Sequence, residues 1–268
     1  MIYINYMGKK RNVKFTFEEE LIEGLIKERK GRFVFIVEIN NKEYKCHCPS
    51  TGTIGRIIFK NIPCLLSKSK NPERTTSYTV EAISLDKPNK TNKNWIGINL
   101  IASNRYVEYF LKEGKFDRII KNIKNIKREI KLGNSKIDFI INNNCYLEVK
   151  SFLEVLRIKI PKYIELKKLR KISAGDRFIK HMLELSESLK EKEKGIILLV
   201  YQYKPNKIKM DIKKSLIKGY DKFKNAVDKF YKSNCELWQV NFSIDKKGIS
   251  ILDYSKINFD DIINLKFN

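Results

Sequence analysis

The 268-residue sequence contains no apolar run near the roughly 18 residues that a membrane-spanning helix needs. Its first residues, MIYINYMGKKRNVKF, lack the apolar stretch of a signal peptide. It has only five cysteines, an odd number without disulfide-like density, which suits a reducing compartment. The protein is therefore predicted to be cytoplasmic.

Acidic residues are also scarce. The chain has 31 Asp and Glu against 55 Lys and Arg, which gives a formal charge of +24. A field of this sign attracts polyanions, above all nucleic acid. Because the excess is mostly lysine, and Asn and Ile are also abundant, a lysine-biased proteome is the alternative explanation. Charge thus indicates a partner but leaves the chemistry open.

Apolar residues are plentiful, at 42% of the chain, enough for one large domain or two ordinary ones. In the first hundred residues, short β-rich stretches alternate with turn residues, which predicts a small barrel. These stretches are 31–39, 42–48, 62–67, 77–85 and 95–100. The segment FEEELIEGLIKERK (17–30) is ambiguous, because its Glu and Leu content favours a helix whereas Gly24 and the apolar pair after it also suit a strand.

From about Ser103 the pattern changes to a mixture of helices and strands. Asn104 stands in a capping position before apolar residues at helical spacing. The run GIILLVYQY (195–203) is typical of a buried central strand. We therefore expect a mixed α/β protein, with a barrel domain over residues 1–95 and an α/β domain over residues 96–268.

Carboxylates occupy the most apolar strands of the second part. Asp138 lies among Ile and Phe, and Glu148 and Lys150, two residues apart, project to one face of a strand. An unpaired buried carboxylate is costly, so two on adjacent strands need a cation between them. Mg²⁺ or Mn²⁺ would suit, and Lys150 would position an attacking water. The alternative is that these acids face solvent or pair with neighbouring lysines.

An acid, a turn and a Glu-x-Lys strand resemble the core of PD-(D/E)xK nucleases, with Asp138 as the first acid and Glu148 and Lys150 as the final pair. Further motifs resemble the sugar fermentation stimulation protein (SfsA) family over nearly the whole chain. They are GLIKERKGRF (24–33), HCPSTG (47–52), LLSKSKNPERTT (65–76), IGIN with Asn104, REIKLGNSKIDF (128–139), CYLEVKS (145–151) and DRFIKH (176–181).

The SfsA resemblance implies an N-terminal OB-fold-like barrel joined to a PD-(D/E)xK nuclease-like domain, with nucleic-acid binding. It also favours a strand within the ambiguous segment. The sequence departs from the family at Ser50, Glu73 and Thr75, and the family's Phe-Pro-Asp-Ala segment is not recognisable after Ser151. The metal-centre residues are retained, whereas residues that would shape the substrate channel differ.

Other residues are candidates for the same site. Glu108, in the helix before the strands, and Glu129, which matches a family Glu, would add catalytic acids, although each would also suit a solvated or paired position. Val149 is expected to complete the metal ligands with Asp138 and Glu148. A zinc site at His47 is not expected, because its neighbouring cysteines have no second Cys/His pair to complete four ligands.

Contacts with nucleic acid are expected from basic and aromatic side chains. The guanidinium groups of Arg74 and Arg128 would clamp phosphates bidentately. The full set of candidates is Arg32, His47, Arg74, Arg128, Arg177 and His181. Outward-facing members of a second set would stack bases: Phe33, Phe35, Tyr44 and Tyr78.

The sequence thus predicts a metal-dependent nuclease that hydrolyses phosphodiester bonds in DNA or RNA, with Mg²⁺ or Mn²⁺ as cofactor and the barrel gripping the strand. A non-catalytic DNA-binding transcriptional regulator with the same fold is the alternative, which the family's name suggests. Nucleic acid is the expected partner, no membrane partner is expected, and a homodimer is left open.

Overall fold

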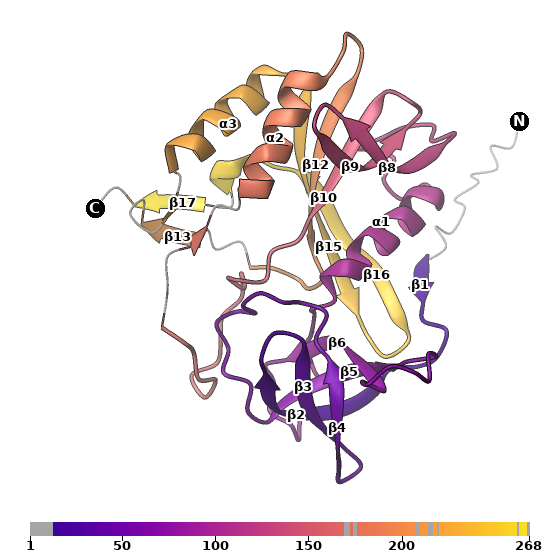
Figure 1. Cartoon of the computed structure of the whole chain (residues 1–268), viewed down its shortest axis with the longest axis vertical. Coiled ribbons are helices and arrows are strands. Elements are labelled where there is room, and N and C mark those ends of the chain that lie inside the picture. The colour runs from indigo at the N-terminus through magenta and orange to yellow at the C-terminus, as the bar shows by residue number, and fades with distance from the viewer. Residues whose placement is uncertain are drawn as a thin grey trace, which may run out of the picture.

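The computed structural model describes residues 13–168, 172–173, 176–206, 210–213, 217–218, 220–261 and 263–266. Two sheets dominate the chain, one above the other in Figure 1. The lower one is a closed barrel, and the upper one is a seven-stranded mixed sheet flanked by helices. The expected mixed α/β class with an OB-like barrel is confirmed.

Five strands form the barrel: β2 (Ile22–Lys30), β3 (Val34–Ile39), β4 (Lys42–His47), β5 (Ile62–Lys68) and β6 (Tyr78–Ser84). They follow the order β4-β3-β2-β5-β6, and a parallel pairing of β4 with β6 closes the ring. A short sixth strand, β7 (Trp95–Gly97), pairs with the outer side of β6. Closure removes the exposed edges that an open sheet would have.

Three features of the barrel follow from packing or from local sequence. The ambiguous segment 17–30 contains strand β2, because Ile26 is fully buried in the barrel core and tertiary packing overrides its helical composition. A Cβ atom at Gly24 would lie 2.7 Å from Val37 Cγ1, so glycine permits the close approach of β3. Asn40 and Asn41 both have positive φ angles, of 50° and 62°, and form the tight β3–β4 turn.

The second sheet has the order β1-β16-β15-β12-β10-β9-β8. Its strands are β1 (Lys14–Thr16), β8 (Ile126–Leu132), β9 (Ser135–Ile141), β10 (Cys145–Lys150), β12 (Lys194–Tyr201), β15 (Cys235–Ile244) and β16 (Gly248–Lys256). Strands β10, β12 and β15 are parallel to one another, and the outer ones are antiparallel. Two short pairs lie apart: β11 (Ile172–Ser173) with β14 (Ile217–Lys218), and β13 (Met210–Lys213) with β17 (Ile263–Lys266).

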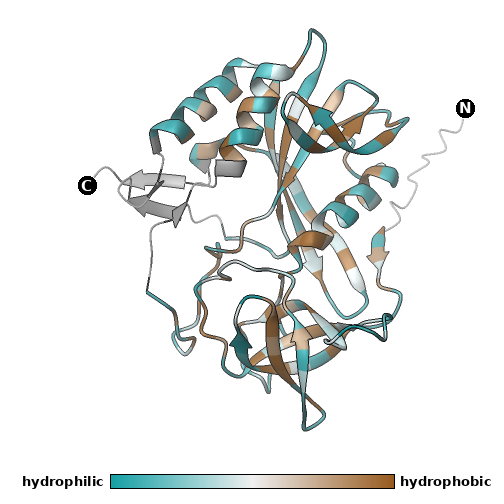
Figure 2. Cartoon of the chain, viewed as in Figure 1, coloured by the Kyte–Doolittle hydropathy of each residue, from teal (hydrophilic) through white to brown (hydrophobic). Residues whose placement is uncertain are grey.

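Helices cover both faces of this sheet: α1 (Ser103–Lys112), α2 (Asp176–Ser188) and α3 (Tyr220–Lys232), with short 3-10 turns at Leu100–Ala102 and Phe259–Asp261. Because strand side chains alternate, Leu198 belongs to the core under α1, whereas Leu199 belongs to the core under α2 and α3. The second core continues into the barrel. Figure 2 shows apolar residues along the sheet strands and polar residues along much of the helices.

Two strands do not follow the expected division of the sequence between residues 95 and 96. β1 lies before the boundary but pairs with β16 in the second sheet, and β7 (Trp95–Gly97) spans the boundary and pairs with β6 in the barrel. The boundary itself stays a prediction. Within the described ranges, no helix combines the length and the apolar character that crossing a membrane requires.

Gln202, which directly follows β12, forms hydrogen bonds that connect the barrel to the second unit. It is 2% exposed, and its side-chain amide donates hydrogen bonds to Asn99 O (2.8 Å) and Ser103 Oγ (2.9 Å). Its backbone oxygen accepts a hydrogen bond from Gly97 N (2.8 Å). A Cβ atom at Gly97 would lie 2.3 Å from Gln202 Oε1, so this contact requires glycine.

We expect Gly97→Ala to lower the free energy of unfolding by about 1–3 kcal/mol, because the added methyl group displaces the Gln202 side chain. Urea denaturation followed by circular dichroism measures the change. Gly52→Ala is the matched control, since a Cβ atom there meets no atom within 4 Å. Equal denaturation midpoints for the two variants would contradict the role of Gly97.

Candidate active site

Asp138 and Glu148 face each other where strands β9 and β10 stop pairing. The last paired residues are Phe139 and Leu147. Beyond them the Asp138 N–H donates to Glu148 Oε2 (3.2 Å), and the Val149 N–H donates to Asp138 Oδ2 (2.8 Å). Each carboxylate thus accepts a hydrogen bond from a backbone amide of the other strand. This reciprocal pair holds both acids at one point of the sheet.

Three more polar side chains converge on the pair. Asn104, in the first turn of α1, donates from Nδ2 to Asp138 Oδ1 (2.7 Å). Lys150 Nζ donates to Glu148 Oε1 (2.5 Å). His181, on α2, places Nδ1 within hydrogen-bonding distance of the same Glu148 oxygen and 3.3 Å from Lys150 Nζ. Elements from both faces of the sheet therefore contribute to this cluster.

The two carboxyl groups have opposite pKa shifts. Burial and the neighbouring charge of Glu148 raise the pKa of Asp138 above its ordinary value. Burial alone would also raise the pKa of Glu148, but the contacts with His181 and Lys150 outweigh it and hold that pKa below its ordinary value. The cluster is thus an ionised Glu148 beside an acid whose negative charge is disfavoured.

The donor set suits a divalent cation. In the described part of the chain no three His, Cys, Asp or Glu side chains gather closely enough to hold a metal by themselves. Mg²⁺, however, binds through one or two carboxylates and fills its remaining positions with water and substrate phosphate. Asp138 and Glu148 provide two such carboxylates, and the backbone carbonyl of Val149 is a further hard oxygen. A cation there would relieve the repulsion that raises the pKa of Asp138.

The other two candidate acids contact cations instead. Glu108, one turn after Asn104 on α1, pairs with Lys112 (2.8 Å) and Arg128 (3.3 Å). Glu129 has a positive φ angle of 51°, and its largely exposed side chain pairs with Lys136 (3.6 Å). Their catalytic roles stay predictions.

The candidate nucleic-acid contacts of the barrel gather at one end. His47 and Thr79 are opposite each other on the closing strands, and both end nitrogens of Arg74 donate to Thr79 Oγ1 (3.3 Å). Burial and the Arg74 charge lower the pKa of His47. The loop 31–33, which carries the exposed Arg32, is joined to this end by a hydrogen bond from Cys48 N to the carbonyl of Phe33 (2.7 Å).

A groove lies between the barrel and the segment that follows the Glu148–Lys150 strand. It has a volume of about 330 Å³ and lies between the PSTG loop (49–52) and segment 151–154, which follows Lys150 directly. Phe152, on its wall, is 40% exposed, and Phe33, close to the PSTG loop through Cys48, is 55% exposed.

Two candidate residues, Asn104 and Arg177, lie in the first turns of helices α1 and α2. Asn104 was expected to cap α1, but the helix begins at Ser103, and Asn99 caps the 3-10 turn before it. Asn104 instead turns its amide to Asp138, a role that a capping pattern does not reveal. Arg177 falls on the first turn of α2, but its side chain lies outside the described residues.

The fold is an OB-type barrel joined to a second unit built on a mixed α/β sheet, with the carboxylate cluster in the second unit. Two family models match consecutive parts of the chain: an SfsA N-terminal OB domain over residues 28–98 and a sugar fermentation stimulation protein RE domain over residues 101–163. The chain belongs to the sugar fermentation stimulation protein family.

Relatives agree with this assignment. A sugar fermentation stimulation protein homolog from Synechococcus sp. (strain JA-2-3B'a(2-13)) is 34% identical over 52% of this chain and 57% of its own length. One from Crocosphaera subtropica is 27% identical over 91% of this chain and 98% of its own. The solved structure of Pyrococcus furiosus SfsA in complex with Ca²⁺ superposes with a TM-score of 0.65 at 14% identity, covering 95% of this chain and all of that one. The chain spans little more than half the length of several curated relatives that it matches, including the first.

Asp138→Asn should keep the hydrogen bond from Val149 and remove the charge beside Glu148. The Asn104 amide, which now donates to Asp138 Oδ1, would turn so that its Oδ1 accepts from the new side-chain NH2 group. The pKa of Asp138 is raised in the folded state, so its contribution to the free energy of unfolding is lost as the pH rises through that pKa. At pH 7 the ionised Asp138 is therefore unfavourable for folding. We expect the variant to denature in EDTA at an equal or higher urea concentration than the wild type.

The same variant tests the metal site through thermal unfolding. Mg²⁺ or Mn²⁺ should raise the melting temperature of the wild type but not that of Asp138→Asn. Asp228→Asn, on the exposed face of α3, should respond to metal as the wild type does. An equal metal response in all three proteins would show that Asp138 binds no metal.

Proposed function

We propose that the protein is a metal-dependent nuclease that hydrolyses phosphodiester bonds in DNA or RNA. The observation that carries this proposal is the reciprocal hydrogen-bonded pair of Asp138 and Glu148 with the Lys150 ammonium group 2.5 Å from Glu148. A merely structural ion pair would not need a second, half-buried carboxylate beside Glu148, because that carboxylate raises the electrostatic cost.

The proposed cofactor is Mg²⁺ or Mn²⁺, held by Asp138, Glu148 and the carbonyl of Val149. When bound, such an ion would polarise a phosphodiester oxygen and activate water. The Pyrococcus furiosus relative was solved in complex with Ca²⁺, which supports a site for a hard divalent cation in this fold.

The chain's own residues position charge around the reacting phosphate. Glu148 and His181 hold the Lys150 ammonium group on the carboxylate side, where it would orient an attacking water and stabilise negative charge developing on the phosphate. Asn104 restrains Asp138 from the opposite side. Because His181 is buried and contacts both Glu148 and Lys150, we expect it to act by positioning them.

The barrel would grip the nucleic acid. In OB-folds the loops between the first two and the last two barrel strands bind oligonucleotides. Here those loops, 31–33 and 69–77, carry Arg32 and Arg74. The groove along the PSTG loop would lead the strand from these arginines to Lys150, with Phe33 and Phe152 as exposed surfaces on which bases stack.

Incubation with labelled single- and double-stranded DNA and RNA, in Mg²⁺, Mn²⁺ or EDTA, tests the proposal. Glu148→Gln should abolish cleavage, and Lys150→Ala should slow it about 100-fold or more while metal still raises the melting temperature. Glu113→Gln, at the exposed end of α1, is the matched control and should cleave at the wild-type rate. Sequence-selective duplex binding without cleavage in any metal would instead support the regulator.

Salt dependence tests the barrel's part in binding. The logarithm of the affinity should fall linearly with the logarithm of salt concentration, each neutralised phosphate adding about 0.7–0.9 to the slope. Arg74→Gln should reduce the slope by about one such unit, measured by fluorescence anisotropy. Arg118→Gln is the control, because Arg118 stacks on Tyr254 in the second unit. An affinity independent of salt would contradict electrostatic binding.

A further inference from the structure

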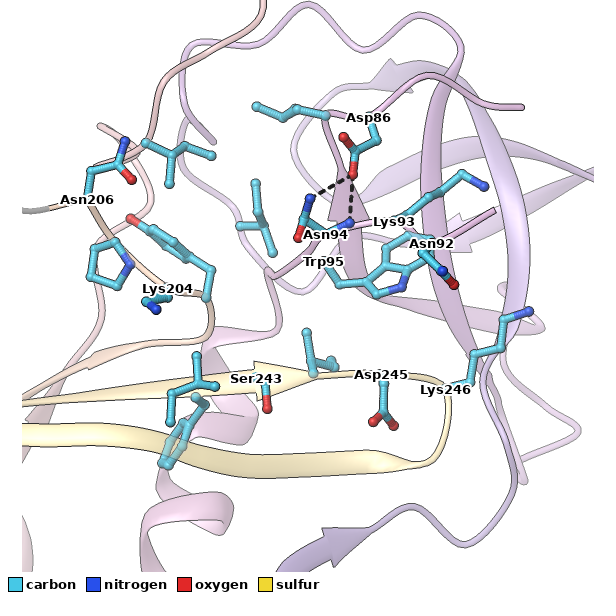
Figure 3. Close-up of a pocket in the computed structure, with 18 of the residues that line it drawn as sticks. Asp86, Asn92, Lys93, Asn94, Trp95, Lys204, Asn206, Ser243, Asp245 and Lys246 are labelled. Atoms are coloured by element: carbon cyan, nitrogen blue, oxygen red, sulfur yellow. Dashed lines mark hydrogen bonds between the residues drawn. The ribbon is translucent and has the colours of Figure 1, made fainter. Parts of the chain in front are cut away.

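A second cavity, of about 1160 Å³, lies between the barrel and the β15–β16 hairpin. Figure 3 shows Trp95 on the barrel side and Ser243 and Asp245 on the hairpin side. Chain segments around 158–161 and 203–206 line it as well. It shares no lining residue with the carboxylate cluster or with the groove at the PSTG loop, so the proposed nuclease centre does not account for it.

The carboxylates of this cavity are already neutralised. Five lysines and three acidic residues line it. Glu23 pairs with Lys93 (2.7 Å) and Lys246 (3.4 Å). The remaining two acids pair with lysines outside the lining, Asp86 with Lys90 and Asp245 with Lys14.

The positive charges of two other lysines in the cavity are not balanced by a carboxylate of the described residues. Lys159 and Lys204 are exposed, and neither forms an ion pair with a carboxylate of the described residues. They come from the two segments that form one wall, so the positive charge concentrates there. An anion in the cavity would therefore meet cations whose charge is not yet balanced.

A buried arginine adds a fixed positive charge behind that wall. Arg157 stands immediately before the lining residues Ile158 and Lys159 and is 7% exposed. Its backbone N–H donates to the hydroxyl of Tyr203, another lining residue. Its guanidinium donates to Gln239 Oε1 (3.0 Å), while its Nε has no hydrogen-bond partner. Within the described chain no carboxylate pairs with it, and its guanidinium carbon lies 5.5 Å from the centroid of the Tyr201 ring.

The opposite side of the cavity is aromatic and apolar. Trp95 is partly exposed and lines the cavity with Leu85 and Ile96. Asn92, beside Trp95, and Asn206, on the lysine wall, add side-chain amides, groups that can pair with the edges of a base. An indole plane, amides and unbalanced cations within one cavity match the three parts of a nucleotide: a flat base, its polar edge and a phosphate.

We propose that this cavity binds a nucleotide, with the base against Trp95 and the phosphate at Lys159 and Lys204. The ligand is either a free mononucleotide or the terminal unit of a nucleic-acid strand, which share this chemistry. The site does not depend on the proposed nuclease activity, because it uses none of the residues assigned to cleavage.

Tryptophan fluorescence tests the proposal on the full chain in EDTA, where cleavage is not measured. The sequence has two tryptophans, and Trp238 lies elsewhere, with its indole N–H bonded to Glu236. Trp238→Phe therefore leaves Trp95 as the only reporter. Adenosine 5′-monophosphate should quench it saturably, adenosine should bind at least about tenfold more weakly, and inorganic phosphate should leave it unquenched. A 5′-phosphorylated oligothymidylate that quenches at lower concentration than the mononucleotide would identify the strand end as the source.

Lys159→Gln combined with Lys204→Gln should weaken mononucleotide binding about tenfold or more, since both cations at the phosphate are lost. The charge-matched control is Lys162→Gln with Lys167→Gln, which alters exposed lysines near the same wall but outside the cavity. If Trp238→Phe fails to fold, isothermal titration calorimetry on the unmodified chain replaces fluorescence. No mononucleotide binding, equal binding by both double variants, or equal binding of inorganic phosphate would each overturn the proposal.

Discussion

The exchange of hydrogen bonds between Asp138 and Glu148 is the constraint on which the candidate site depends. Each carboxylate accepts from a backbone amide of the other strand, so the position of both acids is set by the sheet. The arrangement brings two negative charges together in a buried place, which is unfavourable without a cation. The Lys150 ammonium group balances the Glu148 charge, His181 contacts the same carboxylate, and the Asp138 side is left with a raised pKa. This imbalance is the physical basis for proposing a metal ion.

The barrel and the α/β unit share one continuous core, and this continuity places the functional surfaces. Gln202 joins the end of the central strand to the connection between the units. The groove at the PSTG loop then lies beside Lys150, and the larger cavity with Trp95 lies between the barrel and the β15–β16 hairpin. A shift of one unit against the other would change both, so the packing at Gly97 matters for function as well as for stability.

Much of the architecture could be predicted because it depends on local patterns. The continuous apolar run at 195–203 covers all but the first residue of the central strand β12, and the Asn-Asn pair forms a tight turn. The composition of segment 17–30 left helix and strand open, and burial of Ile26 outweighs the helical propensity of the neighbouring Glu and Leu residues. The capping position predicted for Asn104 was wrong, because its residue type suggests a cap and only the fold brings it to Asp138.

The sequence by itself determined the candidate site residues and the family, because Asp138, Glu148 and Lys150 lie on strands with a clear periodicity and within motifs that match the family. It also determined the positive charge. Tertiary structure alone decided which groups surround those residues: His181 is 31 residues beyond Lys150 in the chain, and Asn104 is 34 residues before Asp138. The charge balance around Arg157 and Trp95 was likewise decided by folding, since pairing of lysines with carboxylates depends on distances that no local pattern encodes.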